Sequence, residues 1–476
     1  MTQSPADAPT QSSLLQAVLC FFGVIGIIAT GLFLLGISLH SLMFLCLIWA
    51  GLHARYLGHS YTSIRTLMSD AIARALPAVY IFILIGMVIA SFMHSGTIAT
   101  LMYFGLDWLA PSLFLSVGML LCAIMSLATG TSWGTVGTLG VVFIGIGGAM
   151  GIPLPLVAGM IVCGATFGDK MSPISDTTNL AAMSAGTNLY RHIYAMLFTT
   201  LPSFLLAFIV FLLLGSRYGD SAFAATQIAA IQTALAASYR LSPLVTLIPI
   251  VVLATLSVRK VPAEITMSVS VLVAVLIAIL YQGSASSLVL NALWENTRGD
   301  TGIESLDDLL GRGGIYSMSW TLMLALMALA LGGILHGAGF LATLLSGIIK
   351  RIQHVAALIA TTICSGLIGN MAMGEAYISI ILNCQLFREK YEQSGLDKAI
   401  LSRSVEEGST LTTGLIPWTT TGVFYAATLG VPVLDYLPYA FFNYFNVFVA
   451  VGFAMLGIGL LRRAEPQDTP AVVTPN

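Results

Sequence analysis

Residues able to bind a cation are concentrated in one short stretch of an otherwise apolar chain. The acidic and basic residues between positions 75 and 190 are Asp107, Asp169, Lys170 and Asp176, and the last three fall between positions 168 and 179. That stretch also contains Gly and Pro, which interrupt a helix and free backbone carbonyls, together with hydroxyl and amide side chains. A hard cation such as sodium prefers oxygen ligands of these kinds. The stretch therefore predicts an ion-binding site.

The two acids of this stretch are the expected centre of the site. We expect Asp169 and Asp176 to hold a cation or protons in alternation, since two nearby carboxylates resist being ionised together. Neutral oxygen ligands are expected from the same stretch and from a glycine-rich stretch near position 132. These candidate ligands are Ser172, Thr177, Thr178, Asn179, Ser132 and Thr131. Lys170 is a candidate counter-charge that an incoming cation or proton displaces; a structural ion pair with either acid is an equal alternative.

The depth of the stretch separates a functional site from a solvated helix end. A helix end in headgroup water is the plain alternative for these charges. Apolar residues 157–167 before the stretch, and mostly apolar or small residues after it, instead place it near the middle of a membrane. Charged groups at that depth are costly and typical of ion pathways.

A related stretch in the second half of the chain keeps the break but not the charge. At an offset of 244, threonines occupy the positions of both Asp residues. A carboxylate stands instead at Glu375, the only acid between positions 353 and 387, and its apolar neighbours favour burial over a surface position. The candidate site residues of this half are Asn370, Glu375, Thr419 and Thr420. Glu406 and Glu407 lie near Arg403, and we expect them on a solvated or paired face.

The composition requires a membrane protein. Of 476 residues, 57% are hydrophobic and 8% charged, against roughly 25% charged in a soluble domain. At roughly 20 apolar residues per crossing, there is material for about ten or more helical spans. The 19 Lys and Arg residues against 21 Asp and Glu residues give no basic field for nucleic acid. We expect membrane lipid around the chain, no nucleic-acid partner, no cofactor and no enzymatic activity.

We predict an all-α polytopic membrane protein with two repeats of inverted topology. Each repeat should have about five spans, a re-entrant hairpin (111–149 and 353–387) and a broken helix (155–190 and 399–434). An odd number of crossings per half inverts the second half, which is typical of secondary transporters. The expected divisions are a disordered tail 1–13, repeat one 14–215, an outer linker 216–240, repeat two 241–461 with an outer acidic loop 295–312, and a disordered tail 462–476.

Loop charges set the expected orientation. Basic residues are typical of cytoplasmic loops. They gather at Arg55, Arg65 and Arg74, at Arg191, and at Arg388, Lys390 and Lys398. The loop 295–312 has five acids against two arginines and is expected outside. Both chain termini should then lie in the cytoplasm.

Two stretches of the first half resemble a known family. Gly130 to Thr138 and Gly168 to Ala181 resemble the NhaC family of bacterial sodium/proton antiporters, and weaker similarity covers most of the chain. The resemblance implies exchange of cytoplasmic sodium or lithium for external protons across the bacterial inner membrane. The chain departs from the family pattern at Glu375 and Ala376, where Asp and Gln are frequent, and at Thr419, where Asn often follows Pro-Trp.

The expected function is therefore secondary active antiport of Na⁺ or Li⁺ against H⁺. The alternative is a sodium- and proton-coupled exchanger of small organic anions such as malate and lactate, which the resemblance also allows. A passive channel is disfavoured because the two paired breaks carry unequal charge. Preference among sodium, lithium and potassium, and association into a homodimer, stay open.

Overall fold

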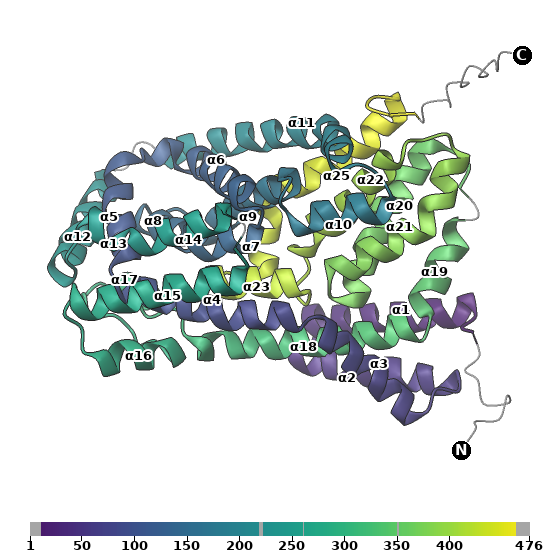
Figure 1. Ribbon diagram of the computed structural model, residues 1–476, viewed down its shortest axis with the longest axis horizontal. Coiled ribbons are helices and arrows are strands. Elements are labelled where there is room, and N and C mark those ends of the chain that lie inside the picture. The colour runs from purple at the N-terminus through teal and green to yellow at the C-terminus, as the bar shows by residue number, and fades with distance from the viewer. Residues whose placement is uncertain (1–10, 219–221, 260, 350–351, 463–476) are drawn as a thin grey trace, which may run out of the picture.

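The computed structural model describes residues 11–218, 222–259, 261–349 and 352–462. Within these ranges the chain is helical, with no strand, and forms an elongated bundle (Figure 1). Most of the two tails expected to be disordered, 1–13 and 462–476, lies outside these ranges.

The first half runs from α1 to α11. The helices are α1 (Leu14–Ala29) with a π-helical end (Thr30–Leu34), α2 (Leu39–Tyr56), α3 (Tyr61–Arg74), α4 (Leu76–His94), α5 (Thr97–Trp108), α6 (Pro111–Thr129), α7 (Ser132–Thr135), a π-helical segment (Val136–Gly140), α8 (Val141–Ala149), α9 (Leu154–Met171), α10 (Asp176–Ala185) and α11 (Leu189–Gly215).

A linking segment and the second half follow. The linking helices are α12 (Ala222–Ser238), α13 (Pro243–Thr246) and α14 (Ile248–Val258). The second half contains α15 (Ala263–Leu280), α16 (Ser286–Trp294), α17 (Glu304–Leu310), α18 (Ile315–Gly337), α19 (Phe340–Ile349), α20 (Val355–Met373), α21 (Ala376–Gln393), α22 (Lys398–Thr413), α23 (Thr420–Leu429), α24 (Val433–Tyr436) and α25 (Phe441–Leu456).

Several of these helices have the length and composition of membrane spans. Among the described residues, 8 helices are long and apolar enough to cross a membrane, or up to 11 if each of three bent pairs is one span. Large apolar side chains such as Leu213 and Leu272 are exposed by 64% and 63%. Extended apolar surface of this kind is stable in lipid and not in water. The protein is a polytopic, all-helical membrane protein.

Several helices occupy segments for which the sequence predicted no helix, α3 and α12 among them. Helix α3 contains Arg65 and Arg74, which were assigned to a cytoplasmic loop, and α12 lies within the expected linker 216–240. A search for long apolar runs passes over α3 because half of its residues are polar or charged. Helix α12 is rich in alanine, which has the highest helix propensity.

The helix boundaries of the two halves correspond at a constant offset. Adding 244 to the bounds of α6 gives those of α20, and adding 244 to the bounds of α10 gives those of α23. The same offset takes the first residue of α9 to that of α22. The segments predicted as hairpins and broken helices therefore have corresponding helix bounds in the two halves.

Hydrogen bonds between these helices follow the same offset. Ser126 Oγ donates to the Ala165 carbonyl at 2.6 Å, and at the corresponding positions Asn370 Nδ2 donates to the Ser409 carbonyl at 2.6 Å. In both halves a polar side chain of the first hairpin arm therefore anchors the broken helix, although the donor differs in type.

Glycine brings the same helices into backbone contact. A Cβ at Gly164 of α9 would collide with the Met119 carbonyl oxygen of α6. A Cβ at Gly408 of α22 would collide with the Ile363 carbonyl oxygen of α20, again at an offset of 244. Only glycine fits at such close approaches.

Each hairpin turns at a glycine and each broken helix at a proline. Gly130 and Gly374 have φ of 70° and 66° and end α6 and α20 in the left-handed conformation. Pro173 and Pro417 lie in the gaps between α9 and α10 and between α22 and α23. Proline lacks an N–H donor, so neither gap continues the helix.

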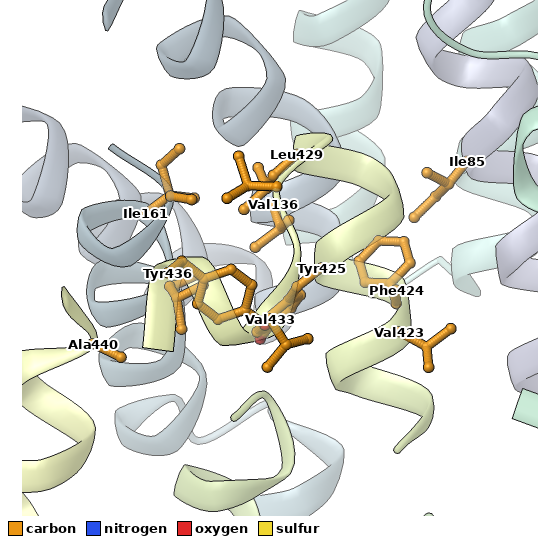
Figure 2. Close-up of a cluster of buried hydrophobic side chains, with 14 of the residues drawn as sticks. Ile85, Val136, Ile161, Val423, Phe424, Tyr425, Leu429, Val433, Tyr436 and Ala440 are labelled. Carbon is orange, nitrogen blue, oxygen red and sulfur yellow. The ribbon is translucent and has the colours of Figure 1, made fainter. Parts of the chain in front are cut away.

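The two halves share one apolar core beside these breaks. Figure 2 shows side chains of α4, α9, α23 and α24, of the π-helical segment after α7 and of the residue before α25 packed together: Ile85, Val136, Ile161, Val423, Phe424, Tyr425, Leu429, Val433, Tyr436 and Ala440. Trp133 of α7 stacks on Phe424 of α23, with ring centroids 4.5 Å apart. Tyr436 Oη donates to the Gly414 carbonyl and so fixes the start of the second break. Packing across the halves therefore holds both breaks in place.

Candidate cation site

Asp169 stands at the break of the first half and is 8% exposed. Its Oδ2 accepts hydrogen bonds from the Ser132 backbone N–H at 3.1 Å and from Ser132 Oγ at 2.6 Å. Its Oδ1 accepts from Ser175 Oγ at 2.6 Å. Ser132 lies in the segment predicted as a hairpin, and Asp169 and Ser175 lie in the segment predicted as a broken helix. The two predicted segments therefore meet at this carboxylate.

Asp169 has no cationic partner. No Lys, Arg or His of the described chain lies within ion-pair distance of its carboxylate. A buried carboxylate without a counter-charge is costly unless a proton or a metal cation compensates it. The site is therefore electrostatically prepared for one of these two ligands.

The other expected ligands of the first half are divided. Ser172 Oγ donates to the Leu127 carbonyl at 2.7 Å. Thr131 caps the start of α7, because its Oγ1 accepts a hydrogen bond from the Gly134 N–H. Asn179 Nδ2 donates to the Pro173 carbonyl, and Thr177 Oγ1 lies 3.1 Å from Ser175 Oγ. These groups shape the break around Asp169 but do not contact its carboxylate.

Thr178 belongs to a different set of contacts. Its hydroxyl lies 3.3 and 3.1 Å from the carbonyls of Asp169 and Lys170, and 3.2 Å from Glu406 Oε1. Its single hydrogen can be donated to one of these acceptors at a time. The structure therefore separates Thr178 from the candidate cation ligands.

Asp176 and Lys170 lie beside the break, but among the described residues neither forms a hydrogen bond or an ion pair with the Asp169 carboxylate. Asp176 is the first residue of α10, its side chain is exposed, and it forms no hydrogen bond within the described residues. Lys170 is fully buried and turns away from both acids; its Nζ donates to Asn446 Oδ1 of α25 at 3.3 Å. The expected ion pair of Lys170 with either Asp is not present.

The second-half candidates form a cluster of their own. Glu375 precedes α21 and accepts from the Tyr377 N–H at 3.3 Å and from Thr420 Oγ1 at 2.7 Å. Asn370 donates to the Ser409 carbonyl, and Thr419 accepts from the Gly422 N–H to cap α23. None of these groups contacts the Asp169 carboxylate.

Tyr377 follows Glu375 by two residues and was not among the residues predicted from the sequence. It lies within electrostatic range of Glu375, Asp176 and Asp169. Its position two residues after the hairpin acid was the available signal. The carboxylates of Asp169 and Glu375 are both buried, and both accept hydrogen bonds from neighbouring groups.

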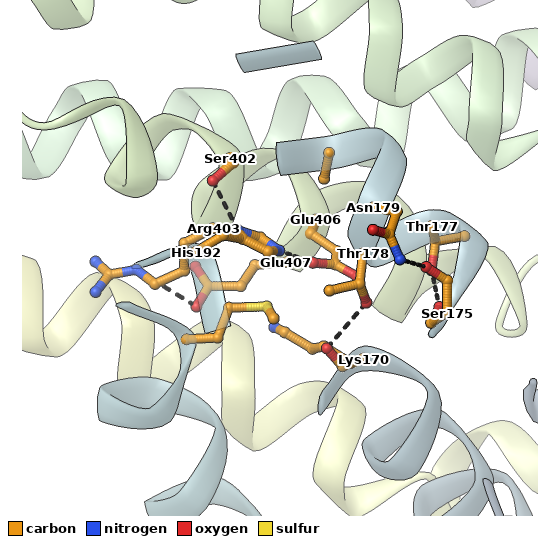
Figure 3. Close-up of polar contacts among 12 residues, drawn as sticks. Lys170, Ser175, Thr177, Thr178, Asn179, His192, Ser402, Arg403, Glu406 and Glu407 are labelled. Carbon is orange, nitrogen blue, oxygen red and sulfur yellow. Dashed lines mark hydrogen bonds and ion pairs between the residues drawn. The ribbon is translucent and has the colours of Figure 1, made fainter. Parts of the chain in front are cut away.

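A second buried polar cluster was also missed. Figure 3 shows it where α9, α10, α11 and α22 meet; its ionisable members are Lys170, His192, Arg403, Glu406 and Glu407, all fully buried. His192 Nε2 lies 2.7 Å from Glu406 Oε2, and Thr199 Oγ1 donates to Glu407 Oε1 at 2.5 Å. Glu406 and Glu407 were expected on a solvated or paired face. They are paired, with His192 and Arg403 respectively, but they are not solvated, because they are fully buried.

The arrangement does not resemble a transition-metal site. In the part of the chain that the structure describes, no three His, Cys, Asp or Glu side chains come together as such a site would need. One carboxylate with neutral oxygens suits an alkali cation or a proton.

Comparison with known proteins agrees with this chemistry. The model of the Na⁺/H⁺ antiporter family matches residues 8–175 and 164–458. The Na⁺/H⁺ antiporter NhaC of Alkalihalophilus pseudofirmus is 39% identical over 92% of this chain and 94% of its own length. NhaC of Bacillus subtilis is 35% identical over 94% and 98%, and the malate-2H⁺/Na⁺-lactate antiporter of the same organism is 34% identical over 84% of each chain. With matches that span both hairpins and both breaks, the chain belongs to the Na⁺/H⁺ antiporter family.

Proposed function

We propose that this protein exchanges sodium or lithium ions for protons, with Asp169 holding the cation and the proton in turn. The observation that carries the proposal is the buried Asp169 carboxylate, which has three hydrogen-bond donors and no cationic partner among the described residues. A proton and a cation compete for the same oxygens, so binding of one requires release of the other.

The two hydroxyls at Asp169 can serve both ligands. Ser132 and Ser175 each donate one hydrogen to the carboxylate in this structure. A serine hydroxyl can rotate and present a lone pair instead. When a sodium ion replaces the proton, both serines become oxygen ligands without moving their backbones.

We also propose the direction and setting of the exchange. Cytoplasmic cations leave and external protons enter across the bacterial inner membrane, with both termini in the cytoplasm. Support comes from the basic residues of the loops assigned to the inside and the acidic residues of 295–312. All groups of the proposed site come from one chain, so the proposal requires no homodimer.

Residues 14–215 and 241–461 are proposed to be inverted repeats that exchange conformations during transport. The shared helix bounds and hydrogen bonds support this. One contact differs: Thr420 donates its N–H to the Gly374 carbonyl at 2.9 Å and its hydroxyl to Glu375. We call this pair of bonds the second-half latch.

The first half has the same positions but no closed latch. Asp176 corresponds to Thr420, and Thr131 corresponds to Glu375. The acid therefore stands at the start of the helix after the break in the first half, and next to the turn glycine in the second half. Asp176 is exposed and forms no hydrogen bond within the described residues. If the repeats exchange conformations, Asp176 and Thr131 close in the opposite state while the second-half latch opens.

Exchange of small organic anions is the second candidate, because one relative is named for malate and lactate. A carboxylate substrate would need a cationic clamp. Arg403 is buried against the carbonyls of Ala195 and Gly459, and Lys170 faces Asn446. Cation exchange is favoured since neither cation faces the Asp169 break.

Proteoliposomes with a preformed pH gradient separate the two functions. Sodium or lithium alone should dissipate the gradient, and Asp169→Asn should abolish the response. Asp107→Asn is the matched control, since Asp107 bonds Gln232 outside the site. Silence with all alkali cations, followed by activity when malate or lactate is added, would instead establish the organic-anion exchanger.

A further inference from the structure

Helix α23 of the second half packs on α7, the short helix of the first half that begins with Ser132. Trp133 of α7 stacks on Phe424 of α23, and its Nε1 donates to Thr421 Oγ1 at 3.3 Å. Thr421, Phe424 and Tyr425 stand at positions i, i+3 and i+4 of α23, which lie on one side of a helix. Tyr425 is therefore on the side of α23 that meets α7.

The Tyr425 hydroxyl reaches the first-half residues around Asp169. Its hydrogen-bond partners are Ser132 of α7 and Thr166 of α9. Ser132 is also a donor to the Asp169 carboxylate, and Thr166 precedes Asp169 by three residues on the same side of α9. Tyr425 thus brings an oxygen of the second half to the edge of the candidate cation site. None of the second-half residues predicted from the sequence does so.

The Tyr425 ring is held by packing on several sides. The side chain is 2% exposed and lies in the apolar core beside Phe424, Val433 and Tyr436 (Figure 2). A Cβ at Gly414 would lie 2.7 Å from Cε2 of this ring, so the ring also touches the second break. Because the ring is packed in this way, its hydroxyl stays near Ser132 whichever group Ser132 bonds.

Ser132 needs such a neighbour if it binds a cation. Within the described residues, the hydrogen-bond partners of Ser132 Oγ are Asp169 and Tyr425. In the proposed cation-bound form a lone pair of Ser132 Oγ faces the ion, so its hydrogen turns away from Asp169. A buried hydroxyl hydrogen without an acceptor costs free energy. A phenol oxygen can accept a hydrogen bond as well as donate one, so Tyr425 can take this hydrogen.

We infer that Tyr425 is a positioning residue of the cation site, whose oxygen accepts the Ser132 hydrogen while Ser132 Oγ binds sodium. The form described here does not need this acceptor, because Ser132 Oγ donates to Asp169 Oδ2 at 2.6 Å. Tyr425 therefore stabilises the cation-bound form over the form without a cation. The inference rests on the proposed function, because it takes Asp169 and Ser132 as cation ligands.

The tyrosine also makes cation binding depend on contact between the halves. At the offset of 244, Ala181 of α10 corresponds to Tyr425 of α23, so the first half has no equivalent hydroxyl. The acid of the site stands in one half and the positioning hydroxyl in the other. The cation-bound form is fully stabilised only while α23 lies against α7, and separation of these two helices should favour release of the ion.

The change Tyr425→Phe removes the oxygen and keeps the ring. In proteoliposomes with the full-length protein, the half-saturating sodium concentration should rise by about tenfold, whereas the maximal rate at saturating sodium should stay within about twofold of the wild type. Tyr391→Phe is the matched control. The Tyr391 hydroxyl is also buried and bonds two hydroxyls, those of Thr362 and Ser404, away from the Asp169 site. This control should leave the half-saturating concentration unchanged.

A double-mutant cycle tests whether Tyr425 acts through Ser132. Sodium-dependent thermal stabilisation of the purified variants measures cation affinity without transport. In Ser132→Ala no hydroxyl hydrogen needs an acceptor, so adding Tyr425→Phe should change the sodium affinity by less than about twofold.

Two results would overturn the inference. One is the same loss of affinity from Tyr425→Phe in the wild-type and Ser132→Ala backgrounds, since Tyr425 would then act independently of Ser132. The other is a half-saturating sodium concentration in Tyr425→Phe equal to that in Tyr391→Phe. Sodium-driven exchange that survives Asp169→Asn would instead overturn the proposed function, whatever the tyrosine variants do.

Discussion

Thr420 offers a direct test of the second-half latch. Thr420→Val removes the hydroxyl that donates to Glu375 Oε2 at 2.7 Å and keeps the side-chain volume. The backbone bond from Thr420 to Gly374 remains. The variant should therefore fold but favour the opposite state, in which the proposed exchange of conformations opens this latch.

The expected shift follows from the burial of the bond. Thr420 and Glu375 are 1% and 8% exposed. A hydrogen bond to a charged acceptor contributes about 1.5 to 3 kcal/mol, so its loss changes the ratio of the two states by roughly 30-fold at about 2 kcal/mol. If the states are balanced in the wild type, the present state falls from about one half to roughly 3% of molecules.

Labelling of a cysteine at position 176 measures this population. Asp176 is exposed in the present state, so Asp176→Cys in a background without the native thiols should react with a membrane-permeant maleimide in proportion to that state. Adding Thr420→Val should slow labelling by roughly 15-fold.

Thr428→Val is the matched control on the same helix. The Thr428 hydroxyl is buried without a hydrogen-bond partner among the described residues. Its removal should not change the labelling rate. Equal rates in the two valine variants would refute the latch as a contact that selects one state.

Three further predictions concern packing, capping and orientation. Gly408→Ala should destabilise the protein by about 1 to 3 kcal/mol in thermal unfolding, because its Cβ meets a backbone carbonyl, whereas Gly452→Ala in open space should be neutral or better. Burial acts to raise the pKa of Asp397, but hydrogen bonds from Arg191 and a backbone N–H lower it overall. The pKa of Asp397 is thus lower in the native state than in the unfolded chain, where it is about 4. Its stabilising contribution is fully present above about pH 4 and is lost as the pH falls through the native pKa. The loss of about 1 kcal/mol in Asp397→Ala should therefore shrink in acid. Single cysteines at Arg65 and Glu304 should be labelled by an impermeant reagent from opposite sides of the membrane; labelling from one side would contradict the inverted topology.

The elements around the site could be predicted from the sequence because they depend on local chemistry. Glycine and proline mark the hairpin turns near 130 and 374 and the breaks near 173 and 417, and apolar runs of suitable length mark the helices between them. Asp169 was identifiable because acidic residues in the middle of an apolar membrane segment are rare. The offset of 244 is likewise visible in the sequence alone, since identical residues recur at that spacing.

Contacts between distant segments could not be predicted in the same way. Glu406 is buried because His192, 214 residues earlier in the chain, lies against it. The nearby Arg403 suggested a solvated or paired face; Arg403 Nε does lie 3.8 Å from Glu407 Oε1, but both side chains are buried, and Arg403 Nη1 also donates to the carbonyls of Ala195 and Gly459. The exposure of Asp176 likewise depends on the packing around the start of α10, which no local pattern encodes.

The backbone contacts made by Gly164 and Gly408 have a consequence for discrimination among ions. Where two helices touch through main-chain atoms, rotation of a side chain cannot change the distance between the helices. That distance is therefore set by close packing of the two backbones. Ser132 and Asp169 belong to the hairpin and helix held together in this way. The width available to an ion between them is therefore fixed more firmly than in a loop. Selectivity for ionic radius depends on such rigidity, so an alanine at Gly164 should change which alkali ion the protein prefers as well as how fast it works.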